Sequence, residues 1–180
     1  PTRFEPVTVL ATVPNALLVH PSLPVSNLKE FLEFARANPD KLSYASQGSG
    51  STAHLTAELF KLKTGLQIAH VPYKGVSAAM TDAIAGHVPV CFCTLPTTLP
   101  HARSGRLRAL AVTTAKRSLA VPELATVAEA GVPGFDGTSW YPFFAPARTP
   151  AALIQKINGD INRILQKPDV RSRFLAMGMV

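Results

Sequence analysis

Short apolar runs alternate with amphipathic stretches of about three turns along most of the chain, a pattern typical of α/β architecture. Proline and glycine stand at most of the ends of these segments, where they interrupt regular structure. The apolar runs predict strands at 16–20, 42–46, 67–71, 88–93, 108–113 and 140–145. The amphipathic stretches predict helices at 27–37, 52–64, 77–85, 97–104, 150–165 and 168–180, with a short helical turn at 127–130.

Two of these helices also predict which of their faces is buried. In the first, which Ser26 caps and Asn38 ends, the apolar residues recur at helical spacing: Leu28, Phe31, Leu32 and Ala35. In the helix at 52–64 we expect the leucines to be buried, namely Leu55, Leu59 and Leu62. Gly65 directly follows that helix and is expected to form its C-cap.

The segments divide into one larger unit and two flanks. Boundaries are predicted at Thr12–Asn15 and at Gly134–Gly137, so that residues 16–136 form one complete α/β lobe of ordinary domain size. The flanks, 1–15 and 137–180, contain too little sheet to form a core alone. We expect them to be crossover strands and helices of a second, incomplete domain that packs against further chain.

Composition narrows the class of protein. Of 180 residues 47% are hydrophobic and 16% charged, which excludes intrinsic disorder. The net charge of +7 favours anionic partners, but the basic residues are dispersed without interleaved aromatics, so no nucleic-acid partner is expected. No apolar run reaches the roughly 18 residues that span a bilayer, so no membrane insertion is expected. The first residues lack the pattern of a signal peptide, as a trimmed secreted protein also would.

The cysteines and acidic residues favour no metal or cofactor site. Cys91 and Cys93 are two residues apart on a predicted strand, a spacing that suits neither a disulfide nor a strong metal site. We expect both to be small buried residues. The chain contains no H-E-x-x-H motif and no paired-carboxylate motif, so no metal-dependent or glycosidase chemistry is predicted.

The strongest local signal is the segment Tyr44–Thr52, a strand followed by a Gly/Ser loop and the start of a helix. Glycines let the backbone approach a ligand, and the free N–H groups of a helix start attract an anion. The spacing Gly48-x-Gly50-x-x-Ala53 matches the looser dinucleotide fingerprint, but the next strand ends without an acidic residue to hold a ribose. The loop is therefore either an anion site or an ordinary capped turn.

Two other classes of function stay open on the residues alone. A hydrolase or transferase would use Ser46 or Ser51 as nucleophile, but no G-x-S-x-G elbow or triad is evident and His54 has no visible orienting acid. A regulatory ligand-binding domain would share the architecture. The aromatic run from Trp140 to Phe144 is either a core strand or a crossover that lines a cleft between domains.

Six segments in a fixed order resemble the substrate-binding proteins of tripartite tricarboxylate transporters, the Bug or TctC-like family. They are Val19-His20-Pro21, Ala45–Ser51 with His54-Leu55, His70–Gly75, Leu107–Thr113, Val127–Gly131 and Ser139-Trp140-Tyr141. The resemblance implies a type II periplasmic-binding-protein-like fold, of which this chain is one complete α/β lobe plus part of the second. It also implies a fragment, with a secretion signal and a ligand loop before it and more chain after Val180.

The function that the resemblance implies is capture of a small organic carboxylate in the periplasm. Closure of two lobes would hold the ligand, and the permease subunits of a membrane transporter would receive it. The implied protein is no enzyme and needs no cofactor or metal. Its ligand-binding residues would be Ser46, Gly48, Ser49, Gly50, Ser51, Thr52, His54, Tyr73, Cys93, Thr94, Trp140 and Tyr141.

One departure from the family bears on the ligand. Where relatives commonly read Phe-Asp-Asn, this chain has Phe92-Cys93-Thr94. If that aspartate binds a ligand ammonium, its absence favours plain or aromatic carboxylates over amino acids. Undiminished affinity of the complete protein for glutamate or aspartate would contradict this hypothesis.

Overall fold

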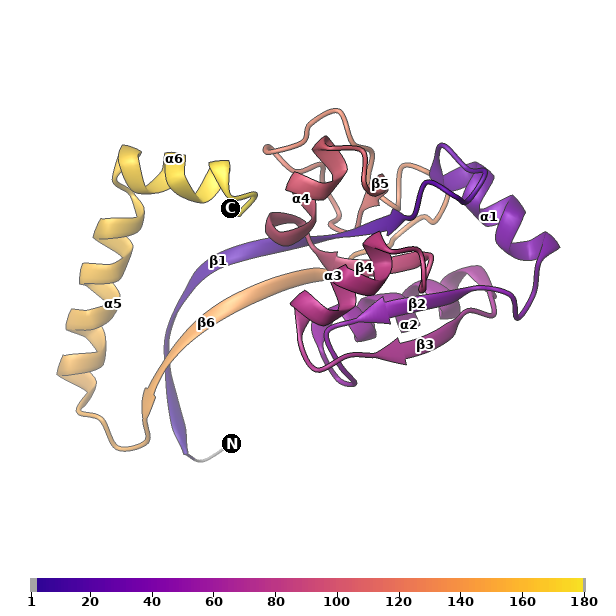
Figure 1. Cartoon of the computed structure of the whole chain (residues 1–180). Helices are drawn as coiled ribbons and strands as arrows, with labels where there is room; N and C mark the ends of the chain where they lie inside the picture. The colour runs from indigo at the N-terminus through magenta and orange to yellow at the C-terminus, as the bar shows by residue number, and fades with distance from the viewer. Residues whose placement is uncertain (1–2, 180) are drawn as a thin grey trace.

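The computed structural model describes residues 3–179 and contains six strands and six helices within them (Figure 1). The strands are β1 (Phe4–Val19), β2 (Ser43–Ser46), β3 (Ala69–Pro72), β4 (Val90–Thr94), β5 (Arg108–Val112) and β6 (Thr138–Pro146). The helices are α1 (Leu28–Ala37), α2 (Thr52–Thr64), α3 (Val76–Ile84), α4 (Leu95–Arg103), α5 (Ala151–Leu165) and α6 (Pro168–Ala176). The predicted α/β class is confirmed.

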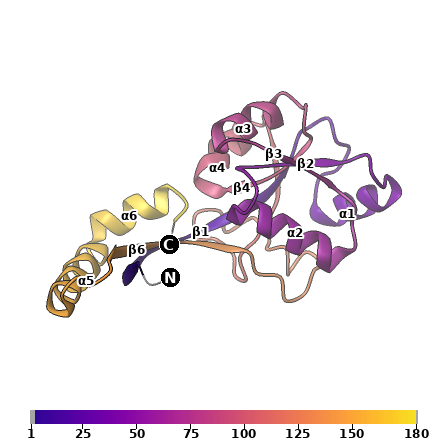
Figure 2. The same cartoon turned by 90° about the horizontal axis from the view of Figure 1, so that it is seen from below.

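A mixed sheet forms the centre of the lobe, with strand order β3-β2-β4-β1-β5 and β6 added along β1. Strand β2 is parallel to both β3 and β4, whereas β1 runs antiparallel to β4, β5 and β6. Phe31 of α1 and Phe60 of α2 belong to one buried cluster, and Met80 of α3 and Leu99 of α4 to another. Helices therefore cover both faces of the sheet (Figure 2).

Strand β1 is far longer than the five-residue strand predicted at 16–20. From Phe4 to Pro14 it pairs with β6, and from Asn15 to Val19 it pairs with β4. The boundary predicted at Thr12–Asn15 thus lies inside one strand, at the point where that strand exchanges partners. Before Thr12 only Val7 and Ala11 are buried, with the exposed Val9 between them, and the register with β6 shifts twice, so this part of the strand lacks the regular two-residue period that predicts a strand from sequence. The division into two domains stays a prediction.

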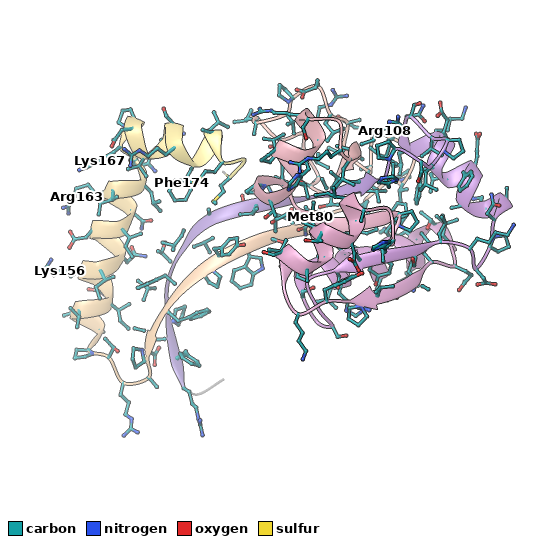
Figure 3. All side chains as sticks on the ribbon, in the orientation of Figure 1. Met80, Arg108, Lys156, Arg163, Lys167 and Phe174 are labelled. Atoms are coloured by element: carbon teal, nitrogen blue, oxygen red, sulfur yellow. The ribbon has the colours of Figure 1, made fainter. Side chains whose placement is uncertain are left out.

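The first part of β1, most of β6, α5 and α6 form an arm that extends from the lobe (Figures 1 and 2). The side-chain amide of Asn158 on α5 donates to the carbonyl of Val7 at 2.6 Å. Phe174 of α6 faces the strands, and Lys156 and Arg163 lie on the outer side of α5 (Figure 3). Neither helix buries a residue fully, and several large apolar side chains of the arm stay exposed: Phe4, Val9, Phe143, Phe144, Leu153 and Ile164.

Helix α1 confirms the predicted buried face but not the predicted cap. The buried residues are Leu28, Phe31, Leu32 and Ala35, as expected, and the helix ends at Asn38. The N-cap is Asn27, whose side chain accepts from the Glu30 amide at 2.9 Å. Glu30 reaches back to accept from the Ser26 amide at 2.7 Å. Asn27 and Glu30 together cap the start of the helix, one residue later than predicted.

Helix α2 confirms the predicted ends and C-cap, but its predicted buried face is wrong. Leu55 is 59% and Leu62 is 82% exposed, and Leu59 is half-buried. The buried residues are Ala53, Thr56, Ala57 and Phe60. The small alanines allow the helix to approach the sheet, and Phe60 packs against Phe92 and Phe135 at ring distances of 5.6 and 6.1 Å. Burying this larger ring outweighs burying the leucines.

A buried polar network marks the point where β1 exchanges partners. The Asn15 side-chain amide donates to Ser139 Oγ at 3.1 Å and to Thr56 Oγ1 at 3.4 Å. Thr113 Oγ1 donates to the carbonyls of Asn15 and Gly137, at 3.0 and 2.9 Å. Asn15, Thr56, Thr113, Gly137 and Ser139 are named the crossover network below. They connect β1, α2, the residues after β5 and the start of β6.

We expect Asn15→Ala to lower the free energy of unfolding by about 2 kcal/mol, because it leaves buried polar groups of the crossover network without partners. Denaturant unfolding of the protein at its full natural length measures this change. The control is Asn162→Ala, at an exposed asparagine of α5, which should change stability by no more than about 0.5 kcal/mol. Equal effects of the two substitutions would contradict the assigned role.

Candidate functional site

The Gly/Ser loop, residues 47–51, lies between β2 and α2, at the edge of the sheet where β2, β3 and β4 end. Ser51 is the N-cap of α2, and its Oγ accepts from the His54 amide at 3.3 Å. Gly48 has φ +129°, a conformation that L side chains rarely adopt, and a Cβ there would lie 3.1 Å from the Tyr73 carbonyl oxygen. Glycine at 48 therefore allows the loop to lie directly against Tyr73.

The loop after β3 holds this Gly/Ser loop from one side. The Tyr73 amide donates to the Ser46 carbonyl and the Gly75 amide to the Gln47 carbonyl, each at 3.2 Å. The Tyr73 hydroxyl donates to Asp82 of α3 at 2.6 Å. Burial and this bond to Asp82 raise the pKa of Tyr73 to about 12, so the phenol stays a neutral donor. Tyr73 thus braces the loop through its backbone and is anchored to α3 through its side chain.

Several donors of the loop are free to meet a ligand. The amides of Ser49 and Thr52 donate to no acceptor among residues 3–179, and both residues are exposed. Thr52 is the first residue of α2, where the N–H groups have no partner inside the helix and the helix dipole is positive. Exposed hydroxyls of Ser49 and Thr52 stand beside these amides. The arrangement suits an anion that accepts several hydrogen bonds.

Three rings form a stacked column beneath the loop. Tyr44 of β2 stacks on His70 of β3 at a centroid distance of 4.8 Å, and His70 stacks on His54 of α2 at 4.1 Å. The Gly50 amide donates to His54 Nδ1 at 3.1 Å. His70 Nε2 is 2.7 Å from Ser46 Oγ, which accepts from the Gly48 amide at 3.2 Å. Each histidine is therefore connected to one glycine of the loop.

At the Tyr44 end of the column, the negative charge of Glu58 is balanced by Lys61. The Tyr44 hydroxyl donates to Glu58 at 2.7 Å, and Lys61 forms an ion pair with the same carboxylate at 2.9 Å. Burial and the Glu58 hydrogen bond raise the pKa of Tyr44 well above its ordinary value. Burial acts to raise the pKa of Glu58, but the bonds from Tyr44 and Lys61 lower it overall. Burial, together with the neighbouring His54, lowers the pKa of His70.

The distance between Ser46 and His70 meets one requirement of a serine nucleophile, a base within hydrogen-bond reach. Ser46, however, is completely buried, and its oxygen already accepts from the Gly48 amide. A substrate carbonyl therefore has no path to this hydroxyl in the observed fold. The pair instead serves to hold the loop.

The residues predicted on β4 have different environments. Thr94 is half-buried at the C-terminal end of β4, near the Gly/Ser loop, and its hydroxyl is 3.0 Å from that of Thr97. Cys93 is fully buried in the core cluster that contains Met80 and Leu99. Its side chain has no exposed surface, so we leave it out of the contacts proposed below. A side chain at 93 does not reach solvent, which removes the basis for inferring ligand class from that position.

Trp140 and Tyr141 lie on β6, just beyond the crossover network, and are 58% and 51% exposed. Their backbone partners on β1 are Thr12 and Ala11. They are therefore not core residues in this chain. Whether a ligand meets them stays a prediction, as it does for the other residues assigned by resemblance.

Two features of the site were missing from the predicted site residues. The sequence pattern places His70 near the end of a predicted strand and gives it no role, although parallel strands that end at one edge bring their last residues together. The sequence pattern assigns Asn15 only to a boundary. The available signal was an asparagine between a proline and an apolar run, because an amide that becomes buried there requires partners.

The larger hollows of the structure are formed by other segments. One of about 490 Å³ lies between α4, β5 and residues 121–124, one of about 430 Å³ lies between β1, residues 114–119 and the start of β6, and one of about 340 Å³ lies between β1 and α6. Among residues 3–179 no group of three or more His, Cys, Asp or Glu side chains is placed to hold a metal ion. None of the helices described is long and apolar enough to cross a bilayer.

Comparison with known sequences supplies the family. A family profile described as "Tripartite tricarboxylate transporter family receptor" matches residues 2–180. BugT of Bordetella pertussis is 38% identical over 173 residues, which cover 96% of this chain and 53% of BugT. A Pseudomonas protein from the tcbD-tcbE intergenic region is 36% identical over 177 residues, 98% of this chain and 53% of its own length. The chain spans about half the length of these curated relatives.

Solved structures match the same fold. Rpa4515 of R. palustris with adipate is 40% identical, with a TM-score of 0.94, and the match covers 99% of this chain and 60% of that one. MatC of Rhodopseudomonas palustris with bound malate is 30% identical, with a TM-score of 0.87, covering 98% and 60%. The periplasmic binding protein BugD is 31% identical, with a TM-score of 0.88, covering 98% and 59%. The expected likeness to periplasmic binding proteins, with one lobe and part of another, is confirmed.

We expect Gly48→Ala to destabilise the fold by about 2 kcal/mol, because the added Cβ meets the Tyr73 carbonyl in a strained backbone conformation. Gly50→Ala is the matched control. Gly50 also has a positive φ, +79°, but a Cβ there meets open space, so about 1 kcal/mol is expected. Urea unfolding of both variants measures the difference, and equal losses would show that the contact with Tyr73 is unimportant.

Proposed function

The chain belongs to the tripartite tricarboxylate transporter receptor family, and we propose that it forms the anion-binding lobe of a receptor for a small organic dicarboxylate. The receptor would act in the periplasm, hold its ligand between two lobes and deliver it unchanged to the permease of a membrane transporter. The family consists of substrate-binding receptors, in which the protein supplies recognition and no reaction. The chain spans only part of its relatives, so this proposal concerns the whole protein.

The observation that carries the proposal is the set of free donors at the start of α2. Ser49 and Thr52 are exposed at the end of the sheet where β2, β3 and β4 meet, and their amides have no acceptor among residues 3–179. A carboxylate removed from water needs several such donors to offset its lost hydration. The donors are already positioned by Gly48, Ser51 and Tyr73, so little ordering is required on binding.

Two relatives support a dicarboxylate as the ligand class. The structure of Rpa4515 is one with adipate and that of MatC is one with bound malate, and the two proteins are 40% and 30% identical to this chain. One carboxylate would meet the Gly/Ser loop, and the other would meet a surface beyond this chain. The net charge of +7 favours association with such dianions.

A ligand screen tests the proposal directly. In the protein at its full natural length, we expect adipate, malate or a related dicarboxylate to raise the midpoint of thermal unfolding and to bind in calorimetric titration. The matched dimethyl esters keep the shape and lose the charge, and they should not bind. Aspartate and glutamate belong in the screen as amino-acid ligands. Absence of binding to all the carboxylates, or equal binding of the esters, would contradict the proposal.

Replacing Thr52 with proline removes its amide donor together with its hydroxyl, whereas alanine removes the hydroxyl alone. Proline is well tolerated at the first position of a helix, and Ser51 before it already has the extended conformation that proline requires, with φ −65° and ψ 157°. We expect Thr52→Pro to weaken dicarboxylate affinity about tenfold, since a hydrogen bond to a charged group is lost. Thr52→Ala is the control that keeps the amide. Calorimetry should find Thr52→Ala the milder change, and the reverse order would contradict an amide contact.

A further inference from the structure

Two histidines hold the two glycines of the Gly/Ser loop. His54 Nδ1 accepts from the Gly50 amide, and His70 Nε2 bonds to the Ser46 hydroxyl, which accepts from the Gly48 amide. The two rings stack at 4.1 Å with an interplanar angle of 22°. Both glycines have positive φ, which glycine adopts without steric cost, so the hydrogen bonds of their amides are what fix the backbone in this one conformation. The stacked imidazoles are therefore built into the shape of the loop.

The bond from Gly50 determines where His54 carries its proton. A backbone amide only donates, so Nδ1 must present a lone pair, and the neutral ring carries its proton on Nε2. Addition of a second proton would put an N–H group on Nδ1, directly opposite the Gly50 N–H. The hydrogen bond would then be lost, and the loop would have to move away from the ring.

This inference rests on the proposed function. We propose that His54 is a positioning residue for the Gly/Ser loop. Its ring acts as a neutral acceptor for the Gly50 amide and does not donate to the ligand. This assignment predicts a direction of pH dependence. A histidine that donates to a carboxylate binds it more tightly when protonated, because the imidazolium adds a positive charge. A histidine that holds Gly50 through Nδ1 binds the ligand less tightly when protonated, because the loop loses its shape.

The surroundings of His54 contain few groups that could reverse this direction. His70 from β3 lies against its face, and Tyr44 from β2 lies behind His70. Glu58 and Lys61 follow on α2 and form an ion pair, and Glu58 also accepts from Tyr44. A second cation on His70 at 4.1 Å from a protonated His54 would be strongly disfavoured. The acid-sensitive contact of the loop is thus the one between His54 and Gly50.

The experiment measures the affinity for adipate of the protein at its full natural length, between about pH 8 and about pH 6, where histidine titrates and carboxylates stay ionised. We expect affinity to fall about fivefold or more toward the acid end. Constant or rising affinity would overturn the positioning role. If neither adipate nor malate binds at any pH, the proposed function fails, and the positioning role is then judged by spectroscopy alone.

Nitrogen-15 NMR of the unliganded protein provides that independent readout. His54 should show an unprotonated Nδ1 and a protonated Nε2 near neutral pH, and the Gly50 amide resonance should titrate together with the ring. The opposite tautomer, or a Gly50 resonance that ignores the titration, would overturn the inference whether or not a ligand is found.

Three variants separate positioning from general structure. His54→Phe keeps a ring to stack on His70 but removes the acceptor, so affinity at about pH 8 should fall roughly tenfold and its pH dependence should vanish. His54→Asn places an oxygen close to the position of Nδ1 and should recover part of the lost affinity without restoring the pH dependence. His20→Gln removes a histidine directly after β1, where its Nδ1 lies 2.8 Å from Ser22 Oγ and the ring has no hydrogen bond to the Gly/Ser loop, and it should keep the wild-type profile. A pH dependence that survives in His54→Phe or disappears in His20→Gln would overturn the assignment.

Discussion

The fold depends on one long strand that belongs to two sheet regions at once. Strand β1 pairs with β4 and β5 at its C-terminal end and with β6 over most of its length, and the exchange occurs at Asn15. Such an exchange interrupts the regular ladder in the middle of a protein, where backbone and side-chain polar groups must still be satisfied. The crossover network meets most of this requirement: Asn15 and Thr113 supply the hydrogen bonds that link Thr56, Gly137 and Ser139, while the buried Asn15 Oδ1 has no partner among residues 3–179.

The candidate site follows from where the parallel strands end. Because β2 and β3 are parallel, Tyr44 and His70 lie side by side, and the loops that leave both strands meet at one edge. Helix α2 then starts against this edge and adds His54 to the stack. The loop is thus shaped by side chains from three elements, while its amides at Ser49 and Thr52 are left unused by the fold. A rigid support with free donors is what anion recognition requires.

Local patterns in the sequence predicted the elements well, because each is set by nearby residues. The ends of α2, its C-cap at Gly65 and the buried face of α1 all follow from spacing and capping chemistry. Three features were out of reach: the length of β1, the buried face of α2 and the role of His70. Each depends on a partner distant in sequence, namely β6 for the strand, Phe92 and Phe135 for Phe60, and Ser46 for the histidine. The family resemblance supplied the site, but it did not distinguish the buried Cys93 from the exposed Thr52.

Helix α2 connects the site to the crossover. Its first turn carries the N-cap Ser51 and His54, which hold the loop, and Thr56 on its buried face accepts from Asn15. Added volume at Gly137 would meet Thr56 at 2.5 Å, so the helix and the start of β6 are already in close contact. A packed helix moves as a unit, and interiors at this density do not absorb small shifts locally. Helix α2 therefore links the candidate anion site to the crossover network, and through Asn15 and Gly137 to β1 and β6, the two strands that lead out of the lobe.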